Sequence, residues 1–348
     1  MDSINVLITG AGAPGIKGTL YSLLKNWDGR PVRAIGVDMK PDVIGRHLCH
    51  RFYQVPPGSS EGFLPALLDI CEKERVDVVV PQVTSELFTL ARHKGDFKKL
   101  GATVALSDYD AIRLANNKHE LLNVARQMGD QHPEYHLVRT WDELERAASG
   151  LGFPFVIKPP VSSGMRGFRV VYEKIDRTRA FFEEKPDGST ITVGELRGIF
   201  GDRFPELLAM EYLPGPEYSV DILSSDDRVL SVIPRKRNQI RSGITFMGTV
   251  EKRDDIIASA EQLTRRIGLR FAHGLQYKEN AEGYPMLIES NPRVQGTMVL
   301  STIAGANIIY GAVKLALGEQ VPDFWVRWDA VLMRYWGGIG IGETTVEL

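Results

Sequence analysis

The segment Leu287-Ile288-Glu289-Ser290-Asn291-Pro292-Arg293 carries the residues best suited to chemistry in this 348-residue chain. Strand alternation would place Glu289 and Asn291 on one face. A carboxylate and an amide oxygen are hard ligands of the kind that Mg²⁺ binds, with phosphate oxygens completing its shell. Arg293 beside them is placed to stabilise a phosphoryl group during transfer. The segment therefore predicts a metal-assisted phosphoryl-transfer site, with Gln276 on the preceding strand as a further candidate.

Two isolated lysines lie upstream where they could contact phosphates. Lys118 opens a predicted helix and Lys158 closes the apolar strand Phe155-Val156-Ile157. The following loop, Ser162 to Gly167, has small residues whose backbone N–H groups can bind phosphate oxygens. A lysine at a strand end is commonly just solvated, so that alternative stays open. The candidate phosphate contacts are Lys118, Lys158, Ser163, Gly164, Arg166 and Gly167.

A second strand ends in the turn Met210-Glu211-Tyr212-Leu213-Pro214-Gly215. A strand that passes into a Pro-Gly turn exposes backbone groups, and these can form paired hydrogen bonds with the edge of an adenine. Glu217, at the edge of the next strand, could then accept hydrogen bonds from ribose hydroxyls. A simple hairpin is the alternative interpretation.

An arginine-rich run follows a later strand, in Pro234-Arg235-Lys236-Arg237-Asn238-Gln239-Ile240-Arg241. Arginine is suited to bidentate recognition of carboxylates. We therefore predict that Arg235 and Arg241 grip an acid substrate. The alternatives are a solvated face or a part of the phosphate site.

The first turn of the chain, Gly10-Ala11-Gly12-Ala13-Pro14-Gly15, matches the dinucleotide fingerprint, and Asp38 ends the next predicted strand. The same pattern serves any βαβ unit whose first turn must be tight. A short-chain reductase would also need a Tyr and a Lys four residues apart on a helix, and we expect the chain to lack that catalyst. The glycine loop alone is therefore a weak indication of nicotinamide binding.

The elements that must position these residues differ between the two parts of the chain. Up to about residue 106, continuously apolar runs alternate with helical patterns, which is typical of a parallel sheet buried on both faces. The stretch from Asp108 to Gly150 is predicted to be mostly helical. From Phe155 onward, strands joined by hairpin-like turns indicate antiparallel sheet, interrupted by predicted helices at Asp254 to Ile267 and Ile308 to Leu317.

Composition indicates an ordinary globular protein. The chain is 43% hydrophobic and 25% charged, with a net charge of -2, so no charge excess favours nucleic acid or acidic lipid. Cys49 and Cys71 are expected to be free thiols, and no segment approaches the roughly 20 apolar residues of a membrane span. Without a recognisable signal peptide, we expect a cytoplasmic protein with small-molecule partners, no nucleic acid and no membrane.

Taken in order, these motifs resemble the ATP-grasp superfamily, in particular the branch similar to the large subunit of carbamoyl-phosphate synthetase. The resemblance covers nearly the whole chain, and its Glu-x-Asn-Pro-Arg element is highly specific. It implies ATP with Lys118 and Lys158 on its phosphates, Glu211, Tyr212 and Leu213 at the adenine, and Glu217 on the ribose. It also implies two Mg²⁺ ions, replaceable by Mn²⁺, with Gln276, Glu289 and Asn291 as ligands. Many relatives have an acidic residue at position 276.

The resemblance implies a mixed α/β and α+β fold, in which a Rossmann-like parallel-sheet domain precedes an ATP-grasp fold. The expected boundaries are a pre-ATP-grasp domain at 1–112, a helical connector at 113–151, a lid at 152–212, and a C-terminal subdomain with the Mg²⁺ and substrate sites at 213–348. In that family the first lobe binds no dinucleotide.

The implied function is an ADP-forming ATP-dependent carboxylate ligase. A substrate carboxylate attacks the γ-phosphate, and an amine or other nucleophile then displaces phosphate from the acyl phosphate, with Arg293, Arg235 and Arg241 as catalytic candidates. A bicarbonate-activating enzyme resembling carbamoyl-phosphate synthetase and a catalytically silent nucleotide-binding module are the alternatives. The sequence is compatible with a homodimer.

Overall fold

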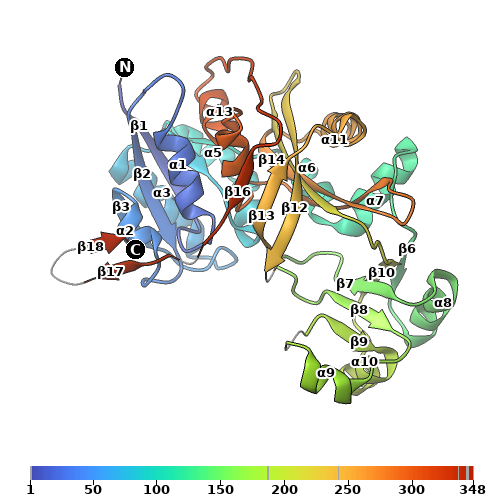
Figure 1. Cartoon of the computed structure of the whole chain (residues 1–348). Coiled ribbons are helices and arrows are strands. Elements are labelled where there is room, and N and C mark those ends of the chain that lie inside the picture. Colours follow the sequence, from blue (N-terminus) through green and yellow to red (C-terminus); the bar gives the residue numbers. More distant parts are fainter. Residues whose placement is uncertain (1, 186–187, 242, 336, 342–344, 348) are drawn as a thin grey trace. The chain divides into compact units, whose positions relative to one another are not determined.

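The computed structural model describes residues 2–185, 188–241, 243–335, 337–341 and 345–347. The chain forms two compact units (Figure 1). We call the first the large unit; it comprises Met1–Ala115, Tyr218–Gln276 and Ser290–Leu348. The small unit comprises Asn116–Glu217 and Tyr277–Glu289.

The large unit begins with a five-stranded sheet in the order β3-β2-β1-β4-β5, in which all paired strands are parallel. Alternate residues of the central strand enter opposite cores: Val6 and Ile8 pack on one side, and Leu7 on the other. Burial on both faces explains why these strands are continuously apolar. The strands are β1 (Ile4–Thr9), β2 (Val32–Asp38), β3 (Arg51–Gln54), β4 (Val78–Val80) and β5 (Thr103–Val104).

Helices cover both faces of this sheet. The helices of this part are α1 (Ile16–Leu24), α2 (Gly45–Leu48), α3 (Phe63–Glu74), the 3₁₀ turn η1 (Thr84–Glu86), α4 (Leu87–Arg92), α5 (Lys94–Lys99) and α6 (Tyr109–Asn116). Residues of α3, α4 and α5 fill one core, whereas α1 lies on the opposite side with the C-terminal helices.

A six-stranded sheet with the order β15-β14-β11-β12-β13-β16 forms the second layer. Its elements are β11 (Glu217–Ser224), β12 (Val229–Arg241), β13 (Ile244–Val250), β14 (Phe271–Glu279), β15 (Pro285–Asn291) and β16 (Val331–Met333), with helices α11 (Asp254–Ile267), α12 (Val299–Ile303) and α13 (Ile308–Ala316). A separate hairpin joins β17 (Ile339–Ile341) and β18 (Thr345–Glu347).

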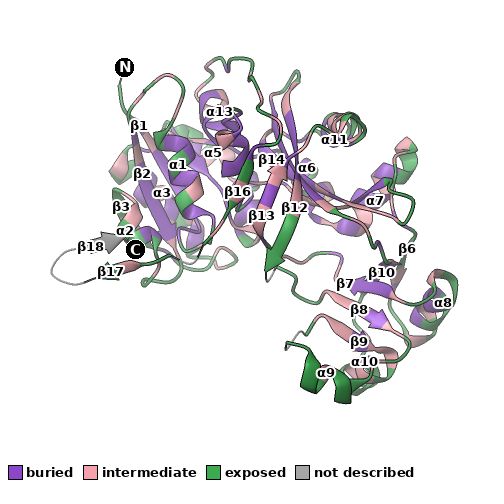
Figure 2. Ribbon diagram, viewed as in Figure 1, coloured by how far each residue is buried: buried purple, intermediate pink, exposed green. Residues whose placement is uncertain are grey.

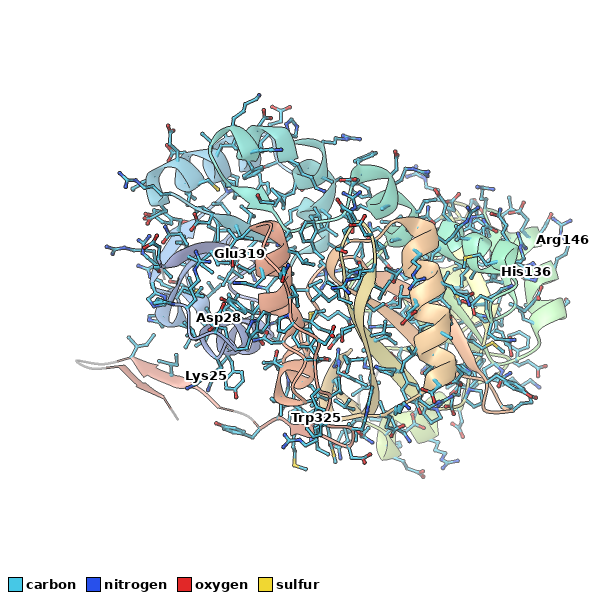
Figure 3. The ribbon with its side chains drawn as sticks, turned by 90° about the horizontal axis from the view of Figure 1, so that it is seen from above. Lys25, Asp28, His136, Arg146, Glu319 and Trp325 are labelled. Carbon is cyan, nitrogen blue, oxygen red and sulfur yellow. The ribbon has the colours of Figure 1, made fainter. Side chains whose placement is uncertain are left out.

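One continuous core joins the parallel sheet to the C-terminal helices. Ile8 and Leu20 share it with Met298 and Ile309. A polar network reinforces it, because Lys314 Nζ donates to Asp28 Oδ2 at 3.0 Å and Arg30 donates to Glu319 at 2.7 Å. Asp28 and Glu319 are labelled in Figure 3. The N-terminal sheet therefore folds as part of the same unit as the C-terminal residues.

The small unit contains a five-stranded sheet in the order β6-β10-β7-β8-β9, antiparallel except between β8 and β9. Its elements are α7 (Lys118–Met128), β6 (Tyr135–Val138), α8 (Trp141–Leu151), β7 (Phe155–Lys158), β8 (Arg169–Tyr172), α9 (Arg177–Glu183), β9 (Thr190–Thr192), α10 (Val193–Phe200) and β10 (Leu207–Glu211). Figure 2 shows α9 as exposed, and none of its residues is buried.

The predicted fold class is confirmed, with two differences in detail. The stretch predicted to be mostly helical contains the strand β6. It pairs with β10, with Tyr135 opposite Met210 and Val138 opposite Leu207. The arginine-rich run is itself the end of a long strand, β12, that pairs with the unpredicted β13. Charged side chains at the end of a long hairpin obscure its alternation. The finer division into four domains stays a prediction. In the described part of the chain, no helix has the length and apolar character needed to cross a bilayer.

Candidate active site

Two lysines of the small unit are buried, and local structure fixes each. Lys158 ends β7 and is 7% exposed, and Lys118 opens α7 and is 5% exposed. Asn117 caps α7 by accepting from the backbone N–H groups of His119 and Glu120. The cap explains why the helix starts here, and it places Lys118 in the first turn.

Both lysines converge on the end of β15, within the small unit. Lys158 Nζ donates to the carbonyl oxygen of Ile288 at 3.1 Å, and Lys118 Nζ lies 3.8 Å from Glu289 Oε2. Lys118 Nζ also donates to the carbonyl and hydroxyl oxygens of Ser162, at 3.0 and 3.3 Å. The structure thus brings together residues that are 171 positions apart in the sequence, from 118 to 289.

The electrostatics of this lysine pair are unusual. Burial lowers the pKa of Lys158 to about 8, with the carboxylates of Glu289 and Glu217 opposing the shift and Lys118 adding to it. Burial also lowers the pKa of Lys118, and Glu289 opposes that shift. A charged ammonium group in a dry environment is stabilised by an anion. The pair can therefore bind phosphate oxygens, which would favour its charged form.

The predicted phosphate loop is exposed from Gly164 to Gly167 and adopts left-handed backbone at Gly164, Met165 and Gly167. A Cβ at Gly167 would lie 2.6 Å from Pro159 Cδ, so this position requires glycine. Arg166 Nη1 donates to the carbonyl of Ser163 at 3.2 Å. The loop follows Lys158 directly, but its contact with phosphate stays a prediction.

The predicted adenine segment is held by its neighbours in the small unit. The Glu211 N–H donates to the Glu134 carbonyl at 2.9 Å. The predicted backbone contact of Glu211 with adenine would therefore use its carbonyl oxygen as the acceptor. The Gly215 N–H donates to the Glu279 carbonyl at 3.0 Å, and a Cβ at Gly215 would lie 2.6 Å from Glu279 Cβ. The turn from Leu213 to Gly215 is thus fixed on β14. The roles of Glu211, Tyr212, Leu213 and Glu217 stay predictions.

Arg293, in the large unit, is oriented by three acceptors. Its Nε donates to Thr84 Oγ1 at 3.1 Å, Nη1 to the Val294 carbonyl at 3.0 Å, and Nη2 to Asn291 Oδ1 at 3.1 Å. Glu86, two residues after Thr84, is buried. Burial raises the pKa of Glu86 to about 7, although the Thr9 hydroxyl and the charge of Arg293 favour its ionised form.

The prediction that Arg235 grips a substrate needs correction. Arg235 is 0% exposed, and it donates to Asp221 Oδ1 at 2.7 Å and to Thr297 Oγ1 at 2.8 Å. Its Nε lies 2.6 Å from Asp221 Oδ2, without the angle of a hydrogen bond. Asp221 accepts a further hydrogen bond from Ser301 at 2.6 Å. The guanidinium is enclosed by its own partners and cannot reach a substrate.

Arg241 differs from Arg235. It lies near the end of the β12–β13 hairpin, is exposed, and has its guanidinium carbon 3.9 Å from the centroid of the Phe246 ring. Its role as a substrate anchor stays a prediction. Arg237, between them, donates to Thr245 Oγ1 and to the Gly243 carbonyl.

The glycine loop is closely packed. A Cβ at Gly10 would lie 2.3 Å from Val83 Cγ2, and one at Gly15 would lie 2.6 Å from Gly296 Cα. The Asp38 carboxylate accepts from the Gly12 and Lys40 N–H groups, at 2.8 and 3.0 Å. These contacts explain the glycines and the aspartate through packing within the large unit.

The expectation that the chain lacks a Tyr-x-x-x-Lys pair was wrong, because two pairs have this spacing, Tyr21 with Lys25 and Tyr310 with Lys314. Tyr21 lies on α1, and Lys25 caps that helix at its C-terminus (Figure 3). The C-terminus of α1 lies at the amino ends of the parallel strands, whereas a dinucleotide binds at their carboxyl ends. Tyr310 and Lys314 lie on α13 and both donate to Asp28, at 2.8 and 3.0 Å, so they are engaged within the large unit. Place in the fold, rather than absence from the sequence, sets both pairs aside.

The predicted metal ligands include amides. Glu289 and Asn291 are two residues apart in β15, and Gln276 lies on β14. Within the described residues, no three His, Cys, Asp or Glu side chains cluster as a metal site. The roles of Gln276, Glu289 and Asn291 as metal ligands stay predictions. Their side chains would offer one carboxylate and two amide oxygens, which are hard donors of the kind that Mg²⁺ binds.

Sequence reasoning missed Asp221 and the role of Thr84. Asp221 was detectable, because a lone acidic residue within the apolar run Tyr218 to Leu223 requires a buried partner. Thr84 carried no such signal, since its partner Arg293 is 209 residues away in the sequence.

Two family models match the chain. One, described as ATP-grasp in the biosynthetic pathway with Ter operon, matches residues 203–336, and the PylC-like N-terminal domain matches residues 6–105. The carbamoyl phosphate synthase large chain of Clostridium acetobutylicum is 22% identical over 273 residues, 75% of this chain. These matches support a member of the ATP-grasp superfamily, and the ATP-grasp model itself covers residues 203–336. The chain spans only 24% of the length of that relative.

Other ATP-grasp relatives agree on the fold. The formate-dependent phosphoribosylglycinamide formyltransferase of Wolinella succinogenes is 27% identical over 227 residues, 64% of this chain and 51% of that protein. The structure of Campylobacter jejuni biotin carboxylase with β,γ-ATP has a TM-score of 0.67 at 19% identity, over 92% of this chain and 73% of that one. The biotin carboxylase domain of Hydrogenobacter thermophilus 2-oxoglutarate carboxylase, solved as a dimer with MgADP and bicarbonate, has a TM-score of 0.69 at 16% identity, over 94% of this chain and 73% of that one.

Proposed function

We propose that this chain is an ATP-dependent ligase that activates a carboxylate as an acyl phosphate. The acyl group then passes to an amine or another nucleophile, and ADP and phosphate are released. The observation that carries the proposal is the buried pair Lys118 and Lys158, which converge on Glu289 and Ile288. Two buried ammonium groups carry more positive charge than the one neighbouring carboxylate compensates, and a bound polyphosphate would offset the excess.

Each polar group then has a task. Lys118 and Lys158 bind the phosphates, the backbone from Glu211 to Leu213 binds the adenine, and Glu217 binds the ribose. A substrate carboxylate oxygen attacks the γ-phosphorus and ADP leaves. Because this transfer requires mainly positioning and charge neutralisation, Arg293 stabilises the charge on the transferred phosphoryl group. The nucleophile then attacks the acyl carbon and phosphate leaves.

The oxygen donors of Gln276, Glu289 and Asn291 fit Mg²⁺, which when bound neutralises phosphate charge. The loop from Ser162 to Gly167 closes over the nucleotide in this proposal. Closure would exclude water, which would otherwise hydrolyse the acyl phosphate.

The test is ADP and phosphate release by the wild-type chain with Mg²⁺-ATP, across a panel of carboxylic acids, each with and without amines. We expect ADP formation to depend on one class of acid. Glu289→Gln should lower turnover by roughly a hundredfold or more, because it removes a charge at the reacting phosphates. Glu282→Gln, an exposed change in the β14–β15 turn, is the matched control and should leave turnover intact. No acid-dependent ADP above background would contradict the proposal and favour a silent nucleotide-binding module.

Bicarbonate belongs in the same panel as a second candidate substrate. The match to carbamoyl phosphate synthase large chains and the bicarbonate in one structural neighbour support this choice. ATP hydrolysis that depends on bicarbonate and on no other acid would decide for this alternative.

A further inference from the structure

Among the contacts described, the guanidinium of Arg293 donates to two acceptors that are close in sequence and to one that is distant. Asn291 Oδ1 and the Val294 carbonyl accept from its Nη atoms and are close in sequence. Thr84 Oγ1 accepts from Nε at 3.1 Å and is 209 residues away. Because the local acceptors move with the segment that carries Arg293, just after β15, the Thr84 contact ties the guanidinium to a different element of the large unit.

Thr84 is itself rigidly placed. It opens η1, the 3₁₀ turn after β4, and Glu86 within that turn is 3% exposed. Glu86 Oε1 accepts the Val83 N–H at 3.2 Å and the Thr9 hydroxyl of β1. The same Thr9 hydroxyl oxygen accepts the Gln82 N–H at 3.0 Å. A buried carboxyl group and a strand residue therefore anchor the turn that carries Thr84.

We propose that Thr84 is a positioning residue for Arg293, holding the Nε edge of the guanidinium in the orientation needed for phosphoryl transfer. The inference rests on the proposed function, since it assigns Arg293 to the transferring phosphoryl group. An arginine has several rotatable bonds, and one hydrogen bond to a fixed hydroxyl removes much of that freedom. Thr84 acts through Arg293 and does not itself contact the substrate.

The kinetic test compares Thr84→Val with Thr84→Ser. Valine keeps the shape of threonine but removes the acceptor, whereas serine keeps it. A misplaced group near the reacting atoms lowers the rate steeply, so we expect Thr84→Val to lower kcat by about ten- to a hundredfold while KM for ATP changes less than about twofold. Thr84→Ser should restore most of kcat. Thr89→Val on α4 makes the same chemical change away from Arg293 and should leave both constants at wild-type values.

Two further arms keep the test decisive. In the Arg293→Lys background, which has no Nε–H, adding Thr84→Val should cause no additional loss of kcat. Independently of turnover, the ¹⁵N NMR signal of the Arg293 Nε–H should exchange slowly with solvent in wild type and in Thr84→Ser, and at least tenfold faster in Thr84→Val.

The outcomes separate the two proposals. Wild-type kcat and slow Nε–H exchange in Thr84→Val would overturn the positioning role, as would equal kcat losses in Thr84→Val and Thr84→Ser. If none of the acids in the panel stimulates ADP formation by the wild-type chain, the proposed function fails. The exchange measurement alone then decides whether Thr84 holds Arg293.

Discussion

Two buried cations at strand positions have opposite surroundings in this protein. Arg235 in the large unit contacts Asp221 and Thr297 through all three of its nitrogen atoms, and both members of the ion pair are 0% exposed. Lys158 in the small unit, by contrast, donates to one neutral acceptor among the described residues, the Ile288 carbonyl. Its pKa is lowered to about 8 by burial, which nearby carboxylates offset only in part.

The comparison separates a buried cation with a full set of partners from one that a ligand could still stabilise. A buried charge with a full set of partners stabilises the fold in which it sits, and removing one partner leaves the other uncompensated. A buried charge with an incomplete set carries a free-energy cost that a bound anion can offset. Arg235 is therefore structural, and Lys158 is suited to a ligand.

The largest expected effect is on stability, from Arg235→Met. The substitution leaves the Asp221 carboxylate buried without its counter-charge, which should lower the free energy of unfolding by about 3–5 kcal/mol. Urea unfolding followed by circular dichroism measures this. Arg241→Met, at an exposed position, is the control and should unfold at the wild-type urea concentration. A double change, Arg235→Met with Asp221→Leu, should recover much of the loss, and equal stability of wild type and Arg235→Met would refute the structural role.

Lys158→Met should weaken ATP binding without weakening the fold. Loss of a charge-assisted contact with phosphate costs about 1.5–3 kcal/mol, or roughly a 10- to 150-fold rise in Kd. The free energy of unfolding should stay the same or increase, because a costly buried charge is gone. Calorimetric titration with a non-hydrolysable ATP analogue and urea unfolding test the two halves. Unchanged Kd with lowered stability would reverse the assignment and make Lys158 a structural residue like Arg235.

The affinity for ATP should also depend on pH, with a sign fixed by Lys158. Phosphate favours the charged lysine, so the pKa of Lys158 rises in the complex from about 8 in the free protein. Affinity is then at its full value below pH 8 and falls as the pH rises above it, by roughly tenfold at pH 9. Titrations from pH 6.5 to 9.5 would show this limb, and the Lys158→Met variant should show a weaker one, since Lys118, whose pKa burial also lowers, remains. A wild-type affinity that is level across the window would place the lysine away from the phosphates.

The smallest expected effect belongs to Arg241, the exposed arginine. If it contacts the carboxylate of the acid substrate, solvent screening limits the contribution to about 0.2–1 kcal/mol, so Arg241→Met should raise KM for the acid up to about fivefold. KM for ATP should stay unchanged. A rise in KM for ATP alone would assign Arg241 to the phosphate site instead.

Several elements of the fold could be predicted from sequence because their patterns are local. The apolar run of β1, the amphipathic helix α11 and the strand β7 ending at Lys158 follow from residue type and spacing alone. The strand β6 could not be predicted, since its four residues gain their strand conformation from pairing with β10, about seventy residues later. The same applies to β13, whose partner β12 carries the arginine-rich run.

The sequence by itself determined the superfamily and the types of residue at the site, because Lys118, Lys158, Glu289, Asn291 and Arg293 fall within short motifs whose chemistry depends on local spacing. Only the tertiary structure decided which of the cations are enclosed. Arg235 and Arg241 are the same residue type in one run of the sequence. In the structure, Arg235 forms a buried ion pair with Asp221 on the neighbouring strand, whereas Arg241 is exposed to solvent. Burial and partners arise from contacts between distant segments, and no local pattern encodes them.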